Sequence, residues 1–401
     1  MITRRGMVAA GLALAGTKVS AQPLSPHVAV GPTPEARPES QTAAPTASRA
    51  IIEKTGAQPR PFRILSIDGG GMKGVVPATV LLTLNSKLRL LNKPGVGDSF
   101  DLFAGTSTGC IIAAALASAP VAATNGGRRC DDPDDMLRIY REKGSTIFDR
   151  GSGFWERTRH NPFDLLGELY SDKGKKQAFL EAFGNIRLGQ LTKNFVSTYY
   201  EMSPQPRAVI AAAGPLFREN NQADFGDLYL RDVVHASSSA PVYFNPAKID
   251  NGKIQAVDGG VFANNPAAAA YFSAGGLLDP SGLAGIEIVS LGCGASTVSY
   301  PTHRASWGPA EWVAPHDGVP LINLVSDSQS SVIDWELRSL LGPRYERFQP
   351  QLPPLVGHNG RQLGAMDDGS VESLEALQAA TLRYVLDPAV DARLNAIAAK
   401  L

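Results

Sequence analysis

The sequence predicts an α/β fold with a largely parallel central sheet. Two observations lead to this expectation. Short apolar runs alternate with helix-like stretches over residues 62–291, and three of the runs end directly in glycine-rich turns. Strands that alternate with helices usually pair in parallel, because each helix connects one strand to the start of the next. In such sheets, functional sites form at the carboxyl ends of strands.

The predicted elements follow from these runs in chain order. Strands are expected at Phe62–Ile67 (FRILSI), 100–104, 194–201, 254–257 and Ile286–Leu291 (IEIVSL). Helices are expected at Val75–Leu90 and 109–117. A further helix separates the last two strands, with Asn265 as its N-cap and Pro266 at its first position.

The N-terminal residues have the composition of an export signal. Arg4 and Arg5 precede a short apolar stretch at residues 7–16, and small residues follow where a signal peptidase would cut. The paired arginines and Lys18 favour the twin-arginine route, with an ordinary Sec signal or an uncleaved anchor as alternatives. The stretch is shorter than the roughly 20 apolar residues of a membrane span. We therefore expect residues 1–21 to be a signal peptide, and the mature protein to be periplasmic or secreted without a transmembrane span.

The rest of the chain reads as a tether followed by one domain. Residues 22–60 are rich in Pro, Ala, Ser and Thr, which predicts a disordered tether. Residues 62–401 are expected to form a single domain with its core motifs at 64–277, because no later linker divides them. The formal net charge of +0 gives no reason to expect a nucleic-acid partner, and the sequence does not set the oligomeric state.

The three cysteines exclude two kinds of site. Cys110, Cys130 and Cys293 are too few and unevenly placed for a disulfide framework, and no zinc-ligand spacing is present. Cys110 and Cys293 stand among apolar and glycine residues, which predicts burial as small hydrophobic side chains. No metal or cofactor is expected.

The first motif with chemical meaning is Gly105–Gly109 (GTSTG), at a predicted strand-to-helix turn. A nucleophilic serine on such a strained turn needs small neighbours, and Gly105 and Gly109 flank Ser107 on both sides. The N-terminus of the following helix would favour negative charge developing beside Ser107.

The second motif, Asp68–Gly74 (DGGGMKG), follows the first strand. Consecutive glycines, here Gly69, Gly70 and Gly71, let several backbone N–H groups point into one concavity, which suits a phosphate or an oxyanion. A P-loop is excluded because Lys73 is followed by Gly74. A dinucleotide fingerprint and a plain tight turn remain as alternatives.

The third motif, Asp258-Gly259-Gly260, follows another predicted strand. Its glycines would let the Asp258 carboxylate come close to a neighbouring loop; alternatively, Asp258 forms an Asx-type turn. A triad would need a histidine after the acid. His303, His316 and His358 satisfy this order, which leaves an α/β-hydrolase-type esterase open.

In this order, the three motifs resemble the signatures of the patatin-like phospholipase family. The segments 236–244 (ASSSAPVYF), 289–292 (VSLG), 345–350 (YERFQP) and 366–368 (MDD) extend the similarity, which covers roughly residues 62–385. The resemblance implies a three-layer fold with helices on both faces of the sheet. It also implies a serine lipid acyl hydrolase that acts at a membrane or micelle surface in lipid catabolism.

The resemblance also implies roles for single residues. Ser107 would be the nucleophile and Asp258 the base, with the N–H groups of Gly69, Gly70 and Gly71 as the oxyanion hole. Lys73 stands where many members carry Arg, and keeps the charge without the fork geometry. A non-catalytic lipid-binding protein of the same fold is the remaining alternative.

Residues 147–170 hold several aromatic and leucine side chains, including Phe154 and Trp155. They are interpreted either as a lid over the site or as ordinary core packing.

Overall fold

The computed structural model describes residues 60–401, apart from residues 131, 148–169, 221–224, 279–284, 297–307, 309–311 and 313–318. Gln58–Leu401 form one compact unit. The predicted signal peptide and nearly all of the predicted tether lie outside the described residues. So does almost all of segment 147–170, which is interpreted above either as a lid or as core packing. None of the helices within the described ranges is long and apolar enough to cross a membrane.

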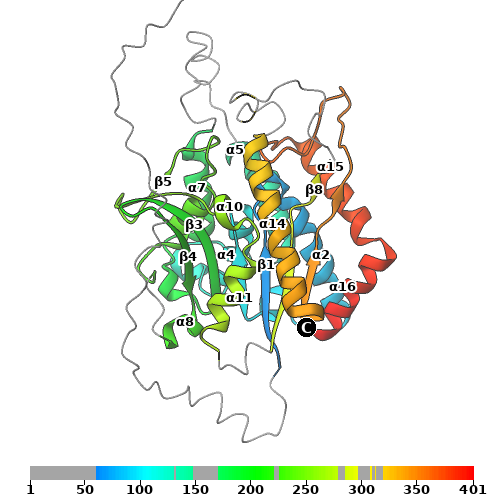
Figure 1. Ribbon diagram of the computed structural model, residues 1–401, viewed down its shortest axis with the longest axis horizontal. Helices are drawn as coiled ribbons and strands as arrows, with labels where there is room; N and C mark the ends of the chain where they lie inside the picture. Colours follow the sequence, from blue (N-terminus) through cyan, green and yellow to red (C-terminus); the bar gives the residue numbers. More distant parts are fainter. Residues whose placement is uncertain are drawn as a thin grey trace, which may run out of the picture. The chain divides into compact units, whose positions relative to one another are not determined.

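The described part of the chain contains one large sheet of eight strands (Figure 1). In chain order they are β1 (Phe62–Ile67), β2 (Leu102–Gly105), β3 (Asn194–Ser203), β4 (Arg207–Ala213), β5 (Ala247–Ile249), β6 (Ile254–Asp258), β7 (Ile286–Leu291) and β9 (Tyr345–Phe348). The sheet order is β5-β6-β3-β2-β1-β7-β9, and β4 also pairs with β3. Neighbours from β3 to β9 run parallel, whereas β4, β5 and β6 pair antiparallel. The short strands β8 (Ala295–Ser296) and β10 (Gln351–Leu352) pair separately.

Helices connect and cover the strands. The α-helices are α2 (Val75–Leu90), α3 (Val96–Ser99), α4 (Thr108–Ser118), α5 (Pro133–Ile147), α7 (Asp172–Phe183), α8 (Pro215–Glu219), α9 (Leu230–Ser237), α10 (Gly260–Ala263), α11 (Ala267–Gly275), α14 (Pro320–Leu341), α15 (Val371–Val385) and α16 (Pro388–Lys400). Short 3-10 helices are η1 (Gly71–Gly74), η2 (Ala123–Asn125), η3 (Leu188–Gln190) and η4 (Gly342–Arg344).

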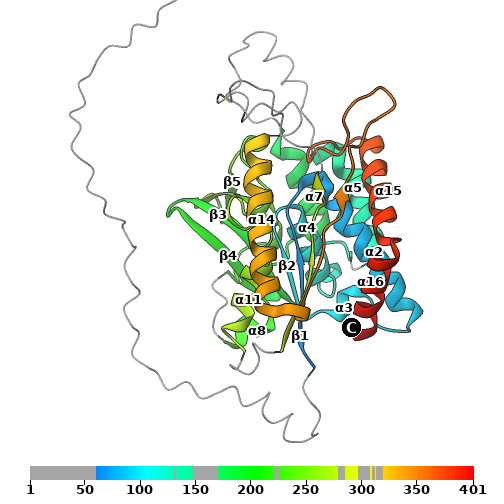
Figure 2. The same cartoon turned by 45° about the vertical axis from the view of Figure 1, so that its right-hand side comes forward.

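The helices lie on both faces of the sheet, as the three-layer prediction requires (Figure 2). Successive side chains of a strand point to opposite faces, so β1 serves two cores. Leu65 and Ile67 join the larger core with α2, α4, α5, α15 and α16, whereas Ile64 joins a second core with α11 and α14. All three side chains are completely buried, which makes β1 the centre of the fold.

Two strands of opposite direction share one edge of β3. β2 pairs in parallel with residues 194–197 of β3, and β6 pairs antiparallel with residues 199–203. β4 occupies the other edge along both stretches, so β2 and β6 must lie on the same edge. The carboxyl ends of β2 and β6 therefore meet near Thr198, and the residues that follow each strand are brought together.

Most of the predicted elements are confirmed. β1, α2 and β7 have the predicted bounds, and α4 differs from its prediction by one residue at each end. β2 begins two residues late, because residues 96–99 form a short helix before it. Pro266, rather than Asn265, is the N-cap of α11, although the Asn265 side chain accepts a hydrogen bond from the Ala267 N–H at 3.1 Å.

Candidate active site

Ser107 lies on the turn between β2 and α4, in a strained backbone conformation. Its φ and ψ are 54° and −122°, a region that residues other than glycine rarely adopt. The turn is also very tight: a Cβ atom on Gly105 would lie 2.2 Å from the Gly109 carbonyl oxygen, and one on Gly109 would lie 2.1 Å from the Ile67 carbonyl oxygen. The flanking glycines are therefore required sterically, as the sequence predicted.

Asp258 ends β6 and faces Ser107. Its carboxylate accepts a hydrogen bond from the Gly260 N–H at 2.7 Å, and it lies close enough to the Ser107 side chain for that group to lower the Asp258 pKa. Gly259 packs so closely on β3 that a Cβ atom there would lie 2.1 Å from the Thr198 hydroxyl oxygen. The third motif thus supplies the acid, one N–H donor and a close contact to the sheet.

The environment of Asp258 raises its proton affinity. The residue is 4% exposed, and burial raises its pKa to about 6. The Ser107 side chain, the hydrogen bond from Gly260 and the charge of Lys175 act in the opposite direction. A carboxylate with this pKa is a better proton acceptor than an exposed aspartate, whose pKa is about 3.9.

The glycine loop offers two backbone donors to the site, rather than the three predicted. Gly69 donates its N–H to the Asn264 carbonyl at 3.0 Å and does not line the cavity, so it is removed from the predicted set. Gly70 and Gly71 line the cavity, and neither N–H bonds to a backbone carbonyl of a described residue. Gly71 has a φ of 57°, and a Cβ atom there would lie 2.1 Å from the Met366 carbonyl oxygen.

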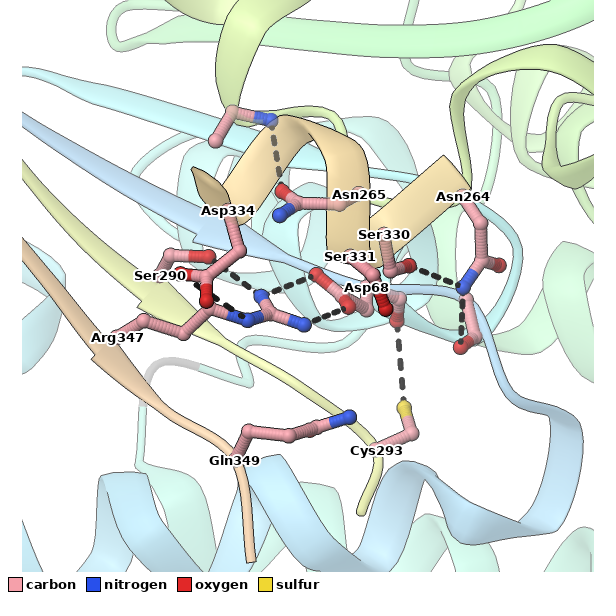
Figure 3. A network of polar contacts seen from close by, with 12 residues as sticks. Asp68, Asn264, Asn265, Ser290, Cys293, Ser330, Ser331, Asp334, Arg347 and Gln349 are labelled. Atoms are coloured by element: carbon pink, nitrogen blue, oxygen red, sulfur yellow. Dashed lines mark hydrogen bonds and ion pairs between the residues drawn. The ribbon is translucent and has the colours of Figure 1, made fainter. Parts of the chain in front are cut away.

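Asp68 anchors the glycine loop through a buried ion pair (Figure 3). Arg347 of β9 donates to both carboxylate oxygens, at 3.0 and 2.6 Å, and also to the Ser290 hydroxyl at 2.8 Å. Both charged side chains are 2–3% exposed. Burial alone would lower the pKa of Arg347, but the attraction of Asp68 outweighs it and raises the pKa above its usual range. Asp68 therefore serves the architecture of the loop.

Lys73 and Gly74 of the second motif shape the start of α2. Lys73 donates its backbone N–H to the Gly70 carbonyl at 3.1 Å, and its side chain does not line the cavity. Gly74 leaves room for two hydroxyls, since a Cβ atom there would lie 2.1 Å from Tyr140 and 2.3 Å from Thr108. Both positions support the loop rather than the cavity surface.

The Ser107–Asp258 pair opens into a cavity of about 360 Å³. Its wall combines Gly70, Gly71 and the start of α4 with side chains from α5, α7, residues 238–244 and α14. Most of these side chains are apolar, among them Ile111, Phe179 and Val325. An apolar chain attached to a polar reacting group is the kind of molecule that fits such a site.

Comparison with known proteins identifies the family. A family model described as "Patatin-like phospholipase" matches residues 65–271, about half of the chain. The chain belongs to the patatin-like phospholipase family. Patatin-like protein 2 of Arabidopsis thaliana is 29% identical over 342 residues, covering 78% of this chain and 80% of that protein. Patatin-like protein 2 of Oryza sativa subsp. indica is 27% identical over 342 residues (78% and 81%), and Patatin-12 of Solanum tuberosum is 26% identical over 349 residues (78% and 81%).

Family membership supports lipid acyl hydrolysis as the general class of activity. Among solved structures, VipD from Legionella pneumophila aligns with 82% of this patatin-like chain and 68% of its own, with a TM-score of 0.31 and 11% identity.

Of the three histidines that the alternative triad could use, the structure describes His358. His358 is fully exposed and bonds to Glu372 through its Nδ1, 2.8 Å from the carboxylate oxygen. His303 and His316 lie outside the described residues, as do residues 148–169 of segment 147–170. No histidine of the described ranges lines the cavity.

Sequence reasoning missed a set of residues that hold the patatin-like site together. Residues 237–239, here called the serine clamp, contact both Ser107 and Asp258. The Ser107 N–H donates to the Ser237 hydroxyl at 3.0 Å, and the Asp258 N–H donates to the Ser239 carbonyl, also at 3.0 Å. The only signal was the small-residue segment 236–244, which gave the resemblance but no roles.

Proposed function

We propose that this protein is a serine lipid acyl hydrolase of the phospholipase A or lysophospholipase type, with Ser107 as nucleophile and Asp258 as general base. The proposal is carried by the placement of Ser107, on a strained strand-to-helix turn, beside a buried Asp258 carboxylate of raised pKa in the same cavity. The pair faces an apolar cavity, which is the environment that a fatty acyl chain requires.

The reaction has two steps. As the Ser107 oxygen attacks the ester carbonyl, its proton passes to Asp258, and the tetrahedral intermediate then expels the alcohol, which takes that proton. The acyl group is now bonded to Ser107. Water attacks this acyl-enzyme, gives a proton to Asp258 and releases the fatty acid, with the proton returning to Ser107. No redox partner is consumed in either step.

The negative oxygen of the tetrahedral intermediate is stabilised by hydrogen-bond donors that are already in position before the reaction begins. We assign this role to the N–H groups of Gly70 and Gly71, together with the N–H of Thr108 at the start of α4, because all three residues line the cavity beside Ser107. One such donor contributes about 2.7–4 kcal/mol to lowering the barrier. The tight packing of Gly71 against Met366 supports the assignment, because it holds the loop rigid.

We further propose that the enzyme works at a membrane or micelle surface in lipid catabolism. Leu321, which lines the cavity, and Leu324, Val332 and Trp335 are 42–70% exposed on α14. Pairs eleven residues apart on a helix share one face, so Leu321 aligns with Val332 and Leu324 with Trp335. An apolar helix face that begins at the cavity suits contact with a lipid surface.

The first test is release of fatty acid from phospholipid vesicles and from a short-chain soluble ester. Wild-type protein is expected to cleave both, and Ser107→Ala to cleave neither. Ser86→Ala, an exposed serine of α2 that does not line the cavity, is a matched control and should retain activity. Full activity in Ser107→Ala or in Asp258→Asn contradicts the proposal.

Export is also proposed, because residues 1–21 have the charged, apolar and small-residue parts of a signal peptide. The N-terminal sequence of the protein recovered outside the cytoplasm should begin just after residue 21. Recovery of the intact N-terminus in the cytoplasm alone contradicts it.

A further inference from the structure

Lys175 of α7 is a buried cation that the proposed mechanism does not use. Its side chain is 1% exposed, and it lines the cavity together with Asp258. The ammonium lies 3.8 Å from the centre of the Phe244 ring. A lysine is rarely buried this fully unless it is paired and hydrogen-bonded, because removing its charge from water is costly.

The ammonium holds the serine clamp. It donates hydrogen bonds to the Ser238 carbonyl at 3.2 Å and to the Ser239 hydroxyl at 2.9 Å. The same clamp contacts the backbone N–H groups of both Ser107 and Asp258, as described above. Lys175 thus reaches Asp258 through Ser239, and it reaches Ser107 through the adjacent clamp residues Ser238 and Ser237.

The charge of Lys175 also acts on Asp258 directly. It favours the ionised carboxylate and so opposes the effect of burial on the Asp258 pKa. Asp172, one helical turn earlier, compensates the ammonium from the other side at 3.7 Å. Asp172 is also 3.4 Å from His235 Nε2 and 3.8 Å from Lys176 Nζ.

We propose that Lys175 is a positioning residue for the hydrolysis: it fixes the serine clamp that aligns Ser107 with Asp258, and it places a positive charge in the same cavity as the Asp258 carboxylate. The inference rests on the proposed function and assigns a further residue to the same site. Lys175 touches neither Ser107 nor Asp258 through a hydrogen bond, so its effect passes through the clamp and through space.

The protonation states of Lys175 and His235 are consistent with this role. Burial lowers the pKa of Lys175 to about 8, whereas Asp172 and Asp258 raise it, so the ammonium remains mostly charged at pH 7. Burial lowers the pKa of His235, which stays neutral there. Among the described residues, the titratable groups that interact with Lys175 or Asp258 are Asp172 and Lys176 on α7, His235 on α9 and Cys110 on α4. The same cavity is also lined by Arg128, Tyr140, Lys143, Glu181 and Tyr243.

The test compares Lys175→Met with Lys176→Met, which removes the neighbouring lysine, whose side chain is 56% exposed. Removing an opposite charge near a carboxylate raises its pKa by about one unit or more. The acidic limb of kcat/KM for a soluble ester should therefore move up by about one pH unit in Lys175→Met, with an about tenfold loss below pH 6. Lys176→Met should keep the wild-type limb.

Two results overturn the proposal. One is a Lys175→Met profile with the wild-type midpoint, and the other is an equal fractional loss at every pH, which a merely structural role would give. If circular dichroism shows that Lys175→Met does not fold, Lys175→Gln takes its place, because glutamine keeps a hydrogen-bond donor but lacks the charge. The midpoint of its acidic limb is then compared with that of the wild type.

A second readout does not depend on activity. The stability gained by Asp258→Asn at pH 7 is measured in the wild-type and Lys175→Met backgrounds, and should be larger without the lysine. An equal gain in both backgrounds overturns the charge coupling. A larger gain in a protein that hydrolyses no ester would instead show that the proposed function fails while the coupling stands.

Discussion

Replacement of Asp258 by asparagine should stabilise the folded protein, and only above about pH 4. The folded-state pKa of Asp258 is about 6, against about 3.9 in an unfolded chain. Because the folded protein binds this proton more tightly, the contribution of Asp258 to stability is greatest below pH 4 and declines as the pH rises through 6. Asparagine resembles the protonated acid in shape and charge, so it avoids this loss.

The size of the effect follows from the pKa difference. About two pH units at 1.36 kcal/mol per unit give a gain of about 3 kcal/mol for Asp258→Asn at pH 7, and almost none at pH 4. The assay is urea unfolding of both proteins at several values between pH 4 and pH 8, with Asp134→Asn as an exposed control. A difference that does not change with pH, or one that favours wild type as the pH rises, refutes the reasoning.

Three other changes test separate parts of the site. Gly71→Ala and Gly360→Ala both place alanine at a positive φ, which should lower the free energy of unfolding in urea by about 1–2 kcal/mol. Only the alanine at position 71 would collide with a backbone atom, the Met366 carbonyl oxygen. Gly71→Ala alone should therefore lower ester hydrolysis, by about 10²-fold. Arg347→Met should lower the free energy of unfolding by about 3–5 kcal/mol, because it leaves the Asp68 carboxylate buried without its charged partner. The double variant with Asp68→Asn should recover part of this loss. No recovery would contradict a stabilising ion pair between Asp68 and Arg347. Leu324→Ser should reduce vesicle hydrolysis several-fold and leave soluble-ester hydrolysis unchanged, and equal losses on both would argue against a lipid-facing role for α14.

The sequence predicted the parallel half of the sheet well because its signals are local. Phe62–Ile67 and Ile286–Leu291 are short, largely apolar runs followed by glycine-containing turns, and they form adjacent parallel strands in the structure. The GTSTG motif is partly local in the same way, since Gly105 packs against Gly109 within the turn, although Gly109 also packs against Ile67 of β1. Local patterns of this kind specify strands and turns directly.

The antiparallel strands and the supporting residues could not be predicted in the same way. β6 approaches Ser107 from the opposite direction to β2, which depends on the shared edge of β3. Arg347 and Asp68 are 279 residues apart in the chain, and the sequence around each residue does not indicate that they pair. Gly69 was expected to be an oxyanion donor like its neighbours, but the carbonyl of Asn264 occupies its N–H.

Covalent labelling by an alkyl fluorophosphonate, with the labelled residue located by peptide mass spectrometry, tests directly whether Ser107 is the nucleophile. We expect one adduct on Ser107, none in Ser107→Ala, and slow labelling in Asp258→Asn. An adduct on any other residue in the active wild type, or Ser107 labelling at the same rate without Asp258, would contradict the proposed mechanism.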